Sequence, residues 1–405
     1  MHTEEGRTMV ENLYERLLSG TSPGAADVGI RIRARYVPAA GEGAKISPPT
    51  YPIEDRRSDS YLDPYLVEQR RLPDGTLRST VLIDSRQSQA NRCEEALQAA
   101  IDEERLWIPH LVLGGEIHGR KLRMTSLTAP HRSCDAYFLN AEDDAGTAFP
   151  DTTIGAELGG ATAGNALALY RYAPTDLIYG IWDSHRGLRL AARFPRVYTS
   201  EVVGWDPQGG VRAAGRYDLL TSGAQKVSVT DSGRSWKIDP NGKSKLSELG
   251  LGSIPPSSRN RRGEPLPGGV SVSEIERLAL LSFVGIGRIR LGEDREAAQT
   301  GRAVLAALAI LGDRLAFGGS GLFLRSGCEL ARVDERIVWI RDGGEEEPLD
   351  VDAKTAYTLV EYAVARAEER GLAWHSEPVC LRPRANLQQA FDAAFFTAIG
   401  DEADT

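Results

Sequence analysis

The polar run over residues 85–92, Ser-Arg-Gln-Ser-Gln-Ala-Asn-Arg, has the residue types of a phosphate-binding turn. It follows residues 81–84, whose apolar and β-branched character predicts a buried strand, and apolar positions with helical spacing begin at residue 90. A helix that starts here leaves backbone N–H groups free at its positive end, with Arg86 close by. We therefore expect an anion-binding turn. An ordinary capped connection between a strand and a helix is the alternative.

Motifs that mark common catalytic sites are incomplete in this sequence. Gly242-Lys243-Ser244 ends like a P-loop, but the position that must be glycine is Lys237. Gly285 and Gly287 lack the third glycine of a dinucleotide-binding turn, because Arg290 stands there. A hydrolytic site would have to combine residues that no spacing brings together: His131, Asp135, Asp84, Asp183 and His185. We therefore expect no catalytic residues.

Metal and membrane signals are also weak. The four cysteines, Cys93, Cys134, Cys328 and Cys380, are far apart and have no histidine nearby at ligand spacing, so we expect neither a metal nor a cofactor. The amino-terminal segment is acidic where a signal peptide is basic and then apolar. The longest apolar run, residues 303–311, is too short to span a bilayer. These features predict a cytoplasmic protein without membrane contact.

Charge is distributed unevenly along the 405 residues. The whole chain has a net charge of −9, but residues 205–270 contain ten basic and six acidic residues, which gives this segment +4 and the rest −13. An acidic body with a basic limb is typical of a protein that binds phosphate locally, and a solvated basic loop is the alternative. Arg31, Arg33 and Arg35 alternate with apolar residues on one predicted strand, as a phosphate-tracking face or a charged edge strand would.

The periodicity predicts an irregular alternation of strands and helices, which suits an α+β fold. We expect helices over residues 9–18, 89–101, 130–140, 152–172, 271–281, 295–315 and 353–370. We expect strands over residues 30–37, 81–84, 177–183 and 196–205, a pair within each of 110–127 and 322–340, and a hairpin within 225–238.

The organising stretch also resembles a known family signature. Residues 83–94, Ile-Asp-Ser-Arg-Gln-Ser-Gln-Ala-Asn-Arg-Cys-Glu, resemble the LDS-x-QSQANR-x-E block of the backbone subunit of type I-G (formerly I-U) CRISPR Cascade complexes, the Cas-seven group of the RAMP superfamily. Further blocks follow in the family's order: Ala129-Pro130-His131-Arg132 with Asp135-Ala136, Pro174-Thr175 with residues 179–184, Arg196 with residues 199–204, and residues 287–291. Gly287 and Leu291 depart from the family's usual Arg-Arg-Leu-Arg-Phe.

The resemblance implies a specific architecture and function. It implies an RRM-like (ferredoxin-like) palm with long thumb and finger insertions: an N-terminal segment and finger over 1–79, palm over 80–204, thumb over 205–270, and the rest of the palm with C-terminal helices over 271–405. It implies a non-catalytic subunit that polymerises head to tail along crRNA and presents the guide to target DNA. Other implied partners are a large Cascade subunit, a fused crRNA-processing and end-capping subunit, and a recruited helicase-nuclease.

The RNA-binding candidates follow from both lines of reasoning. Arginine, amide and hydroxyl side chains can donate to phosphates and 2′-hydroxyls without reading bases, which a guide-holding subunit requires. Our candidates are Ser85, Arg86, Gln87, Ser88, Gln89, Asn91, Arg92, His131 and Arg132, with Lys226, Arg234 and Lys237 on the thumb. Two alternatives stay open: an RNA-cleaving backbone subunit of the type III kind that uses Asp84, or a soluble small-molecule enzyme with an incidental basic loop.

Overall fold

An eight-stranded antiparallel sheet forms the body of the protein in this computed structural model. The structure describes residues 4–51, 62, 65–117, 119–182, 193–212, 214–220, 223–232, 235–257 and 266–404. The strand order is β18-β19-β1-β17-β9-β3-β2, and β20 pairs with β19. These strands are β1 (Gly29–Pro38), β2 (Val67–Arg71), β3 (Leu77–Asp84), β9 (Tyr198–Trp205), β17 (Glu274–Ser282), β18 (Gly321–Phe323), β19 (Glu329–Ile340) and β20 (Glu346–Pro348).

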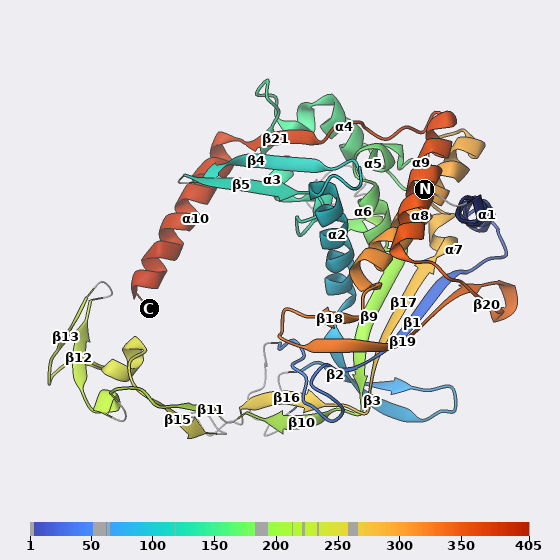
Figure 1. Cartoon of the computed structure of the whole chain (residues 1–405). Coiled ribbons are helices and arrows are strands. Elements are labelled where there is room, and N and C mark those ends of the chain that lie inside the picture. Colours follow the sequence, from blue (N-terminus) through green and yellow to red (C-terminus); the bar gives the residue numbers. More distant parts are fainter. Residues whose placement is uncertain are drawn as a thin grey trace.

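Helices cover one face of this sheet (Figure 1). The covering helices are α1 (Glu4–Gly20), α2 (Arg86–Asp102), α8 (Arg295–Phe317) and α9 (Ala353–Glu369). In β1, Ile30, Ile32 and Ala34 are buried beneath the helices, whereas the alternate arginines point to the opposite face. We call that opposite side the open face.

A buried ion-pair network joins α8 to the sheet. Arg277 of β17 is fully buried, and its Nη1 lies 2.7 Å from Oδ2 of Asp313 in α8. Asp313 also accepts from the Tyr198 hydroxyl at 2.5 Å, and Arg314 pairs with Glu335 of β19 at 2.7 Å. Because charges in a low-dielectric interior need partners, this network specifies how α8 sits on the sheet.

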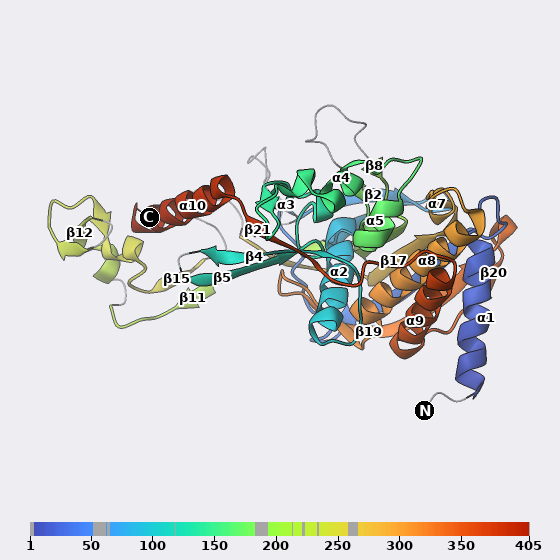
Figure 2. The ribbon, with the colours of Figure 1, turned by 90° about the horizontal axis from the view of Figure 1, so that it is seen from above.

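A smaller sheet with strand order β5-β4-β21-β6 lies beside the body. It consists of β4 (Leu111–Ile117), β5 (Arg120–Thr125), β6 (Ala141–Glu142) and β21 (Val379–Pro383), and β21 runs parallel to β4. α10 (Ala385–Asp404) follows β21 and extends away from both sheets (Figures 1 and 2). Five short helices complete the body: α3 (Ala136–Leu139), α4 (Thr153–Gly159), α5 (Leu167–Tyr172), α6 (Pro174–Tyr179) and α7 (Phe283–Ile286).

The described residues between 208 and 271 form a long projection that we call the arm (Figure 1). Its stalk pairs β10 (Gln208–Val211) with β16 (Pro267–Ser271) and β11 (Ala214–Arg216) with β15 (Ile254–Ser257). Its tip is a three-stranded sheet of β13 (Trp236–Ile238), β12 (Ser228–Asp231) and β14 (Ser244–Lys245). Ala224, Val229 and Leu246 form a small hydrophobic core in the tip.

Most sequence-based elements are confirmed, but four are not. Residues 271–281 form strand β17 instead of a helix, and the strand expected over 177–183 is only the two-residue strand β7 (Ile181–Trp182), after the end of helix α6. The expected helix over 152–172 is two short helices, α4 and α5, and residues 130–140 form a 3₁₀ turn followed by α3. The mixed α+β class is correct. None of the helices that the structure describes is long and apolar enough to cross a membrane.

Candidate nucleic-acid interface

The predicted turn at the start of α2 is present. Ser85 is the N-cap of α2, and its side chain accepts a hydrogen bond from the Ser88 backbone N–H at 3.2 Å. Gln87 and Asn91 are exposed. The Arg86 side chain is 60% exposed, and its Nε lies 3.4 Å from Oε2 of Glu201. These side chains can donate to a phosphate chain at the surface, where the positive end of the helix favours negative charge.

Gln89 and Arg92 are directed toward the protein. The carboxylate of Asp84 accepts hydrogen bonds from Gln89 Nε2 and from Arg92 Nε, the latter at 2.8 Å. Gln89 is fully buried, and its Oε1 also accepts from Ser200 of β9 at 2.7 Å. Both ends of the Gln89 amide are therefore bonded within the protein, to Asp84 and to Ser200. We revise the expectation for Gln89 from RNA contact to positioning, because these bonds hold α2 against the sheet. Asp84 is buried with the same partners, which leaves it poorly placed to cleave RNA.

Arg132 is buried as well. Its Nε and Nη2 donate to the two carboxylate oxygens of Glu94 at 2.6 and 2.7 Å, and its Nη1 donates to the Gly180 carbonyl at 2.9 Å. Burial raises the pKa of the Glu94 carboxyl, and the Arg132 guanidinium opposes that shift. The role expected of Arg132 therefore changes from contact to positioning. The neighbouring His131 is exposed and stays a candidate.

Arg196 is a site residue that sequence reasoning missed. It lies just before β9, is half buried, and has no hydrogen bond or ion pair within the described part of the chain. Burial and the charges of Arg132 and Arg86 lower the pKa of its guanidinium, and Glu94 opposes this shift, so Arg196 is close enough to the other two arginines to be repelled by them. An anion between Arg86 and Arg196 would relieve that repulsion. No local spacing could reveal this, since the packing of α2 on β9 brings together residues that are 110 positions apart.

The open face carries a row of charges next to the α2 turn. Arg336, Arg33, Leu278 and Glu201 are successive partners across β19, β1, β17 and β9. Glu201 also pairs with Arg70 Nη1 at 2.9 Å, and Arg33 Nε donates to Glu276 at 2.8 Å. β1 is a central strand, so its arginines do not protect a sheet edge. They form a charged surface, partly neutralised by carboxylates, that continues from Arg86.

The arm presents cations and apolar side chains together. Lys226 and Lys237 are exposed, as expected for nucleic-acid contacts, whereas Arg234 lies outside the described residues. The tip region also exposes Tyr217 by 84%, Leu219 completely and Ile238 by 68%. Such a concentration of exposed apolar side chains on one projection indicates a protein-contact surface.

The described residues give no support to the hydrolytic combination considered from the sequence. Asp135 is the N-cap of α3, accepting from the Tyr137 N–H at 3.1 Å, and Asp183 and His185 lie outside the described residues. Among the residues the structure describes, no three His, Cys, Asp or Glu side chains cluster as metal ligands.

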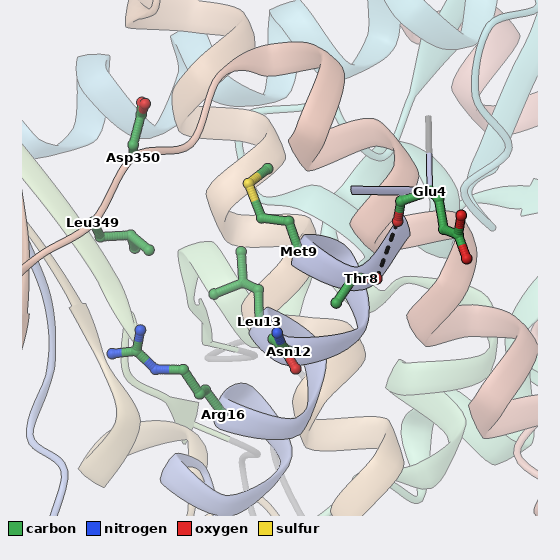
Figure 3. A pocket seen from close by; sticks show the side chains of 8 residues that line it. All are labelled: Glu4, Thr8, Met9, Asn12, Leu13, Arg16, Leu349 and Asp350. Carbon is green, nitrogen blue, oxygen red and sulfur yellow. Dashed lines mark hydrogen bonds between the residues drawn. The ribbon is translucent and has the colours of Figure 1, made fainter. Parts of the chain in front are cut away.

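One open pocket is shown in Figure 3, between α1 and the segment that follows β20. Its volume is about 580 Å³, and its charged lining residues are Glu4, Arg16 and Asp350. Met9 and Leu13 supply apolar lining, and Thr8 is bonded to the Glu4 carbonyl at 3.0 Å. The lining has no cysteine, serine or histidine among the described residues.

Comparison with known families places the α2 turn within a shared region. The family model described as CRISPR-associated protein GSU0053 matches residues 30–208, so this part of the chain is similar to a CRISPR-associated family. The matched segment runs from β1 to the start of the arm and includes Arg86, Asn91, Arg132 and Arg196. The match confirms the family resemblance noted in the sequence. No curated protein matches the chain.

Proposed function

We propose that this protein is a non-catalytic, guide-RNA-binding backbone subunit of a type I CRISPR surveillance complex. The observation that carries the proposal is the surface at the start of α2, where exposed Arg86, Gln87 and Asn91 lie beside Arg196, which has no partner among the described residues, inside the family-matched segment. Several copies would follow one another along the crRNA and leave its bases free to pair with target DNA. A repeating head-to-tail contact of this kind does not close on itself, as a ruler along RNA requires.

The connection order of the main sheet supports an RRM-like palm. β19, β1, β17 and β9 are neighbours in that order, all antiparallel. In the chain, α2 lies between β1 and β9, and α8 lies between β17 and β19. This is the β-α-β-β-α-β plan of ferredoxin-like folds, with β2 and β3 added beyond β9. RRM domains use such a sheet, with its free face, to bind single-stranded RNA.

The chemistry of the surface suits a strand of any sequence. Guanidinium and amide groups donate to phosphates and 2′-hydroxyls, which are the same at every nucleotide. Each subunit of a guide-holding filament must accept a different stretch of spacer, so this indifference is required. On this proposal the arm is the thumb that contacts the next copy. The large subunit, the fused processing and end-capping subunit and the helicase-nuclease would bind the assembled filament.

Copurification with RNA tests the proposal directly. The protein, expressed with a CRISPR array and its partner subunits, should carry RNA of uniform length, and Arg86→Glu should remove most of it. Arg7→Glu in α1, which is 78% exposed, is the matched control and should retain the RNA. Arg92→Glu is unsuitable, because it would place a carboxylate against Asp84 and disturb α2. Unaltered circular dichroism of Arg86→Glu confirms that its fold is intact.

A cleavage assay tests the non-catalytic part. Assembled complex incubated with complementary RNA and Mg²⁺ should leave the RNA whole. Regularly spaced cuts would refute the proposal in favour of an RNA-cleaving subunit. Absence of copurifying RNA from the wild-type complex would refute guide binding altogether.

A further inference from the structure

A small cavity lies where the loop after α1 meets α7. Its volume is about 220 Å³, and the loop residues Ser22, Gly24 and Asp27 form one wall. Arg288 and Arg290, which follow α7, form the other wall and are exposed. The two walls are close together: a Cβ at Gly287 would lie 3.3 Å from both the Phe283 and the Thr21 carbonyl oxygens. Glycine at 287 therefore allows this approach.

A buried arginine reaches the same segment from α8. Arg302 is 4% exposed, and its Nη1 donates to the carbonyl of Ile289, between the two arginines of the wall, at a long 3.4 Å. Its Nε is buried and has no hydrogen-bond partner. No carboxylate of the described residues pairs with Arg302. Burying a charged group without a counter-charge is costly, so the position calls for an anion.

The charges around the cavity also favour the binding of an anion. Arg290 is close enough to Arg302 to lower the pKa of its guanidinium, in addition to the effect of burial. The one carboxylate in the lining belongs to Asp27, whose Oδ1 is 3.6 Å from Nη1 of Arg341. With Asp27 partly neutralised in this way, Arg288 and Arg290 line a space of about 220 Å³, and Arg302 contacts the backbone between them from the protein interior. Planar guanidinium groups bind oxyanions by paired, charge-assisted hydrogen bonds.

We propose that this cavity binds a phosphate group, held by Arg288 and Arg290 at its wall and supported by Arg302 from below. The site is separate from the α2 turn, and it does not depend on the guide-holding function. The phosphate could belong to a nucleic-acid strand that passes the cavity or to a free phosphate compound, because both present the same oxygens.

Titration with inorganic phosphate tests the site. At constant ionic strength, maintained with chloride, phosphate should bind the wild-type protein by calorimetry and raise its melting temperature. Arg288→Gln combined with Arg290→Gln should weaken phosphate binding by roughly tenfold or more, since two charge-assisted hydrogen bonds are lost. Arg295→Gln is the matched control, an exposed arginine at the start of α8 that does not line the cavity. It should bind phosphate as the wild type does.

Arg302→Met provides an independent test that does not depend on surface charge. The variant should lose the phosphate-dependent rise in melting temperature, yet unfold no earlier than the wild type when phosphate is absent, because an uncompensated buried charge has been removed. A wild type indifferent to phosphate, or a double variant that responds as fully as the control, would overturn the proposal.

A second arm of the experiment identifies the source of the phosphate. A short single-stranded RNA without terminal phosphates is added to the wild type and to the Arg288→Gln, Arg290→Gln variant, both in the Arg86→Glu background. If affinity falls with the two cavity substitutions, the site takes a strand phosphate. If the two proteins bind the RNA equally well but the double variant binds inorganic phosphate more weakly, the site takes a free phosphate compound.

Discussion

Arg132 and Glu94 form a two-point ion pair inside the protein, with Nε and Nη2 of the arginine 2.6 and 2.7 Å from the two carboxylate oxygens. Arg132 adopts a positive φ of 54°, which is uncommon for a residue other than glycine. Its third donor, Nη1, bonds to the Gly180 carbonyl. The pair thus connects α2 to the turn after α6 and supports the surface where Arg86 and Arg196 lie.

We predict that Glu94→Ala lowers the free energy of unfolding by about 3–5 kcal/mol, because it leaves the Arg132 guanidinium buried and unpaired. Denaturation with urea, followed by circular dichroism, measures the change. Glu95→Ala is the matched control, since its partner Arg325 is 83% exposed and a surface pair contributes about 0–1 kcal/mol. Equal losses in the two variants would show that the buried pair is not important for stability.

A second prediction concerns pH. Burial raises the pKa of Asp176 to about 7, against the opposing effects of the Ser133 hydroxyl and Arg132. A carboxyl whose folded pKa exceeds its unfolded value binds more protons when folded, so its stabilising contribution is present at low pH and is lost as pH rises toward 7. Asp176→Asn should therefore gain stability relative to the wild type between about pH 4 and pH 7, by up to a few kcal/mol.

Urea denaturation of both proteins at several pH values measures this difference. The Asn side chain keeps the size of the carboxyl and can still accept from Ser133 Oγ, so the comparison isolates the charge. A difference in stability that stays constant from pH 4 to 7 would contradict the shift.

The start of α2 could be predicted from the sequence because its signals are local. Ser85 caps the helix, and the apolar positions that follow have the spacing that α2 buries. The inward roles of Gln89 and Arg132 could not be predicted, because their partners Ser200 and Glu94 come from other elements. A polar residue in a sequence pattern typical of phosphate binding can instead bond inward and position the neighbouring residues.

β17 shows why one central strand was misassigned. Its sequence, Glu-Ile-Glu-Arg-Leu-Ala-Leu-Leu-Ser, consists largely of good helix formers preceded by serine, which is typical of a helix start. Pairing with β1 on one side and β9 on the other overrides that preference. The alternation was obscured because the buried side includes Arg277, a charged residue that only the partner Asp313, from α8, makes acceptable there.

A third prediction concerns the salt dependence of RNA binding. If Arg86 contacts a phosphate, each such contact contributes a slope of roughly −0.7 in a plot of log affinity against log salt concentration for a single strand. Arg86→Gln should therefore reduce the magnitude of the slope by roughly that amount and weaken binding equally for RNAs of unrelated sequence. Fluorescence anisotropy with two labelled RNAs measures both quantities. The Arg7→Gln variant should keep the wild-type slope.

The same assay addresses Arg196. Arg196→Gln should also reduce the slope, because the Arg196 guanidinium lies close to Arg86 and its Nε has no hydrogen-bond partner among the described residues. A reduction that appears with one RNA sequence alone would indicate base recognition and would contradict a backbone contact.

The last prediction concerns the tip of the arm. Trp236 and Ile238 of β13 are 48% and 68% exposed, and residues two apart on a strand point to the same side. If this side contacts the next copy, Trp236→Glu combined with Ile238→Glu should prevent filament growth on RNA. The fold should remain stable, since the tip core of Ala224, Val229 and Leu246 is untouched.

Sedimentation velocity in the presence of a long single-stranded RNA distinguishes the outcomes. The wild type should form species that grow with RNA length, and the double variant should bind as separate monomers with an unaltered melting temperature. Phe323→Glu, at a side chain of β18 that is 71% exposed, controls for the removal of an apolar surface group elsewhere. Filaments of wild-type size in the double variant would place the contact between copies outside β13, and the exposed tip would then have to serve another partner.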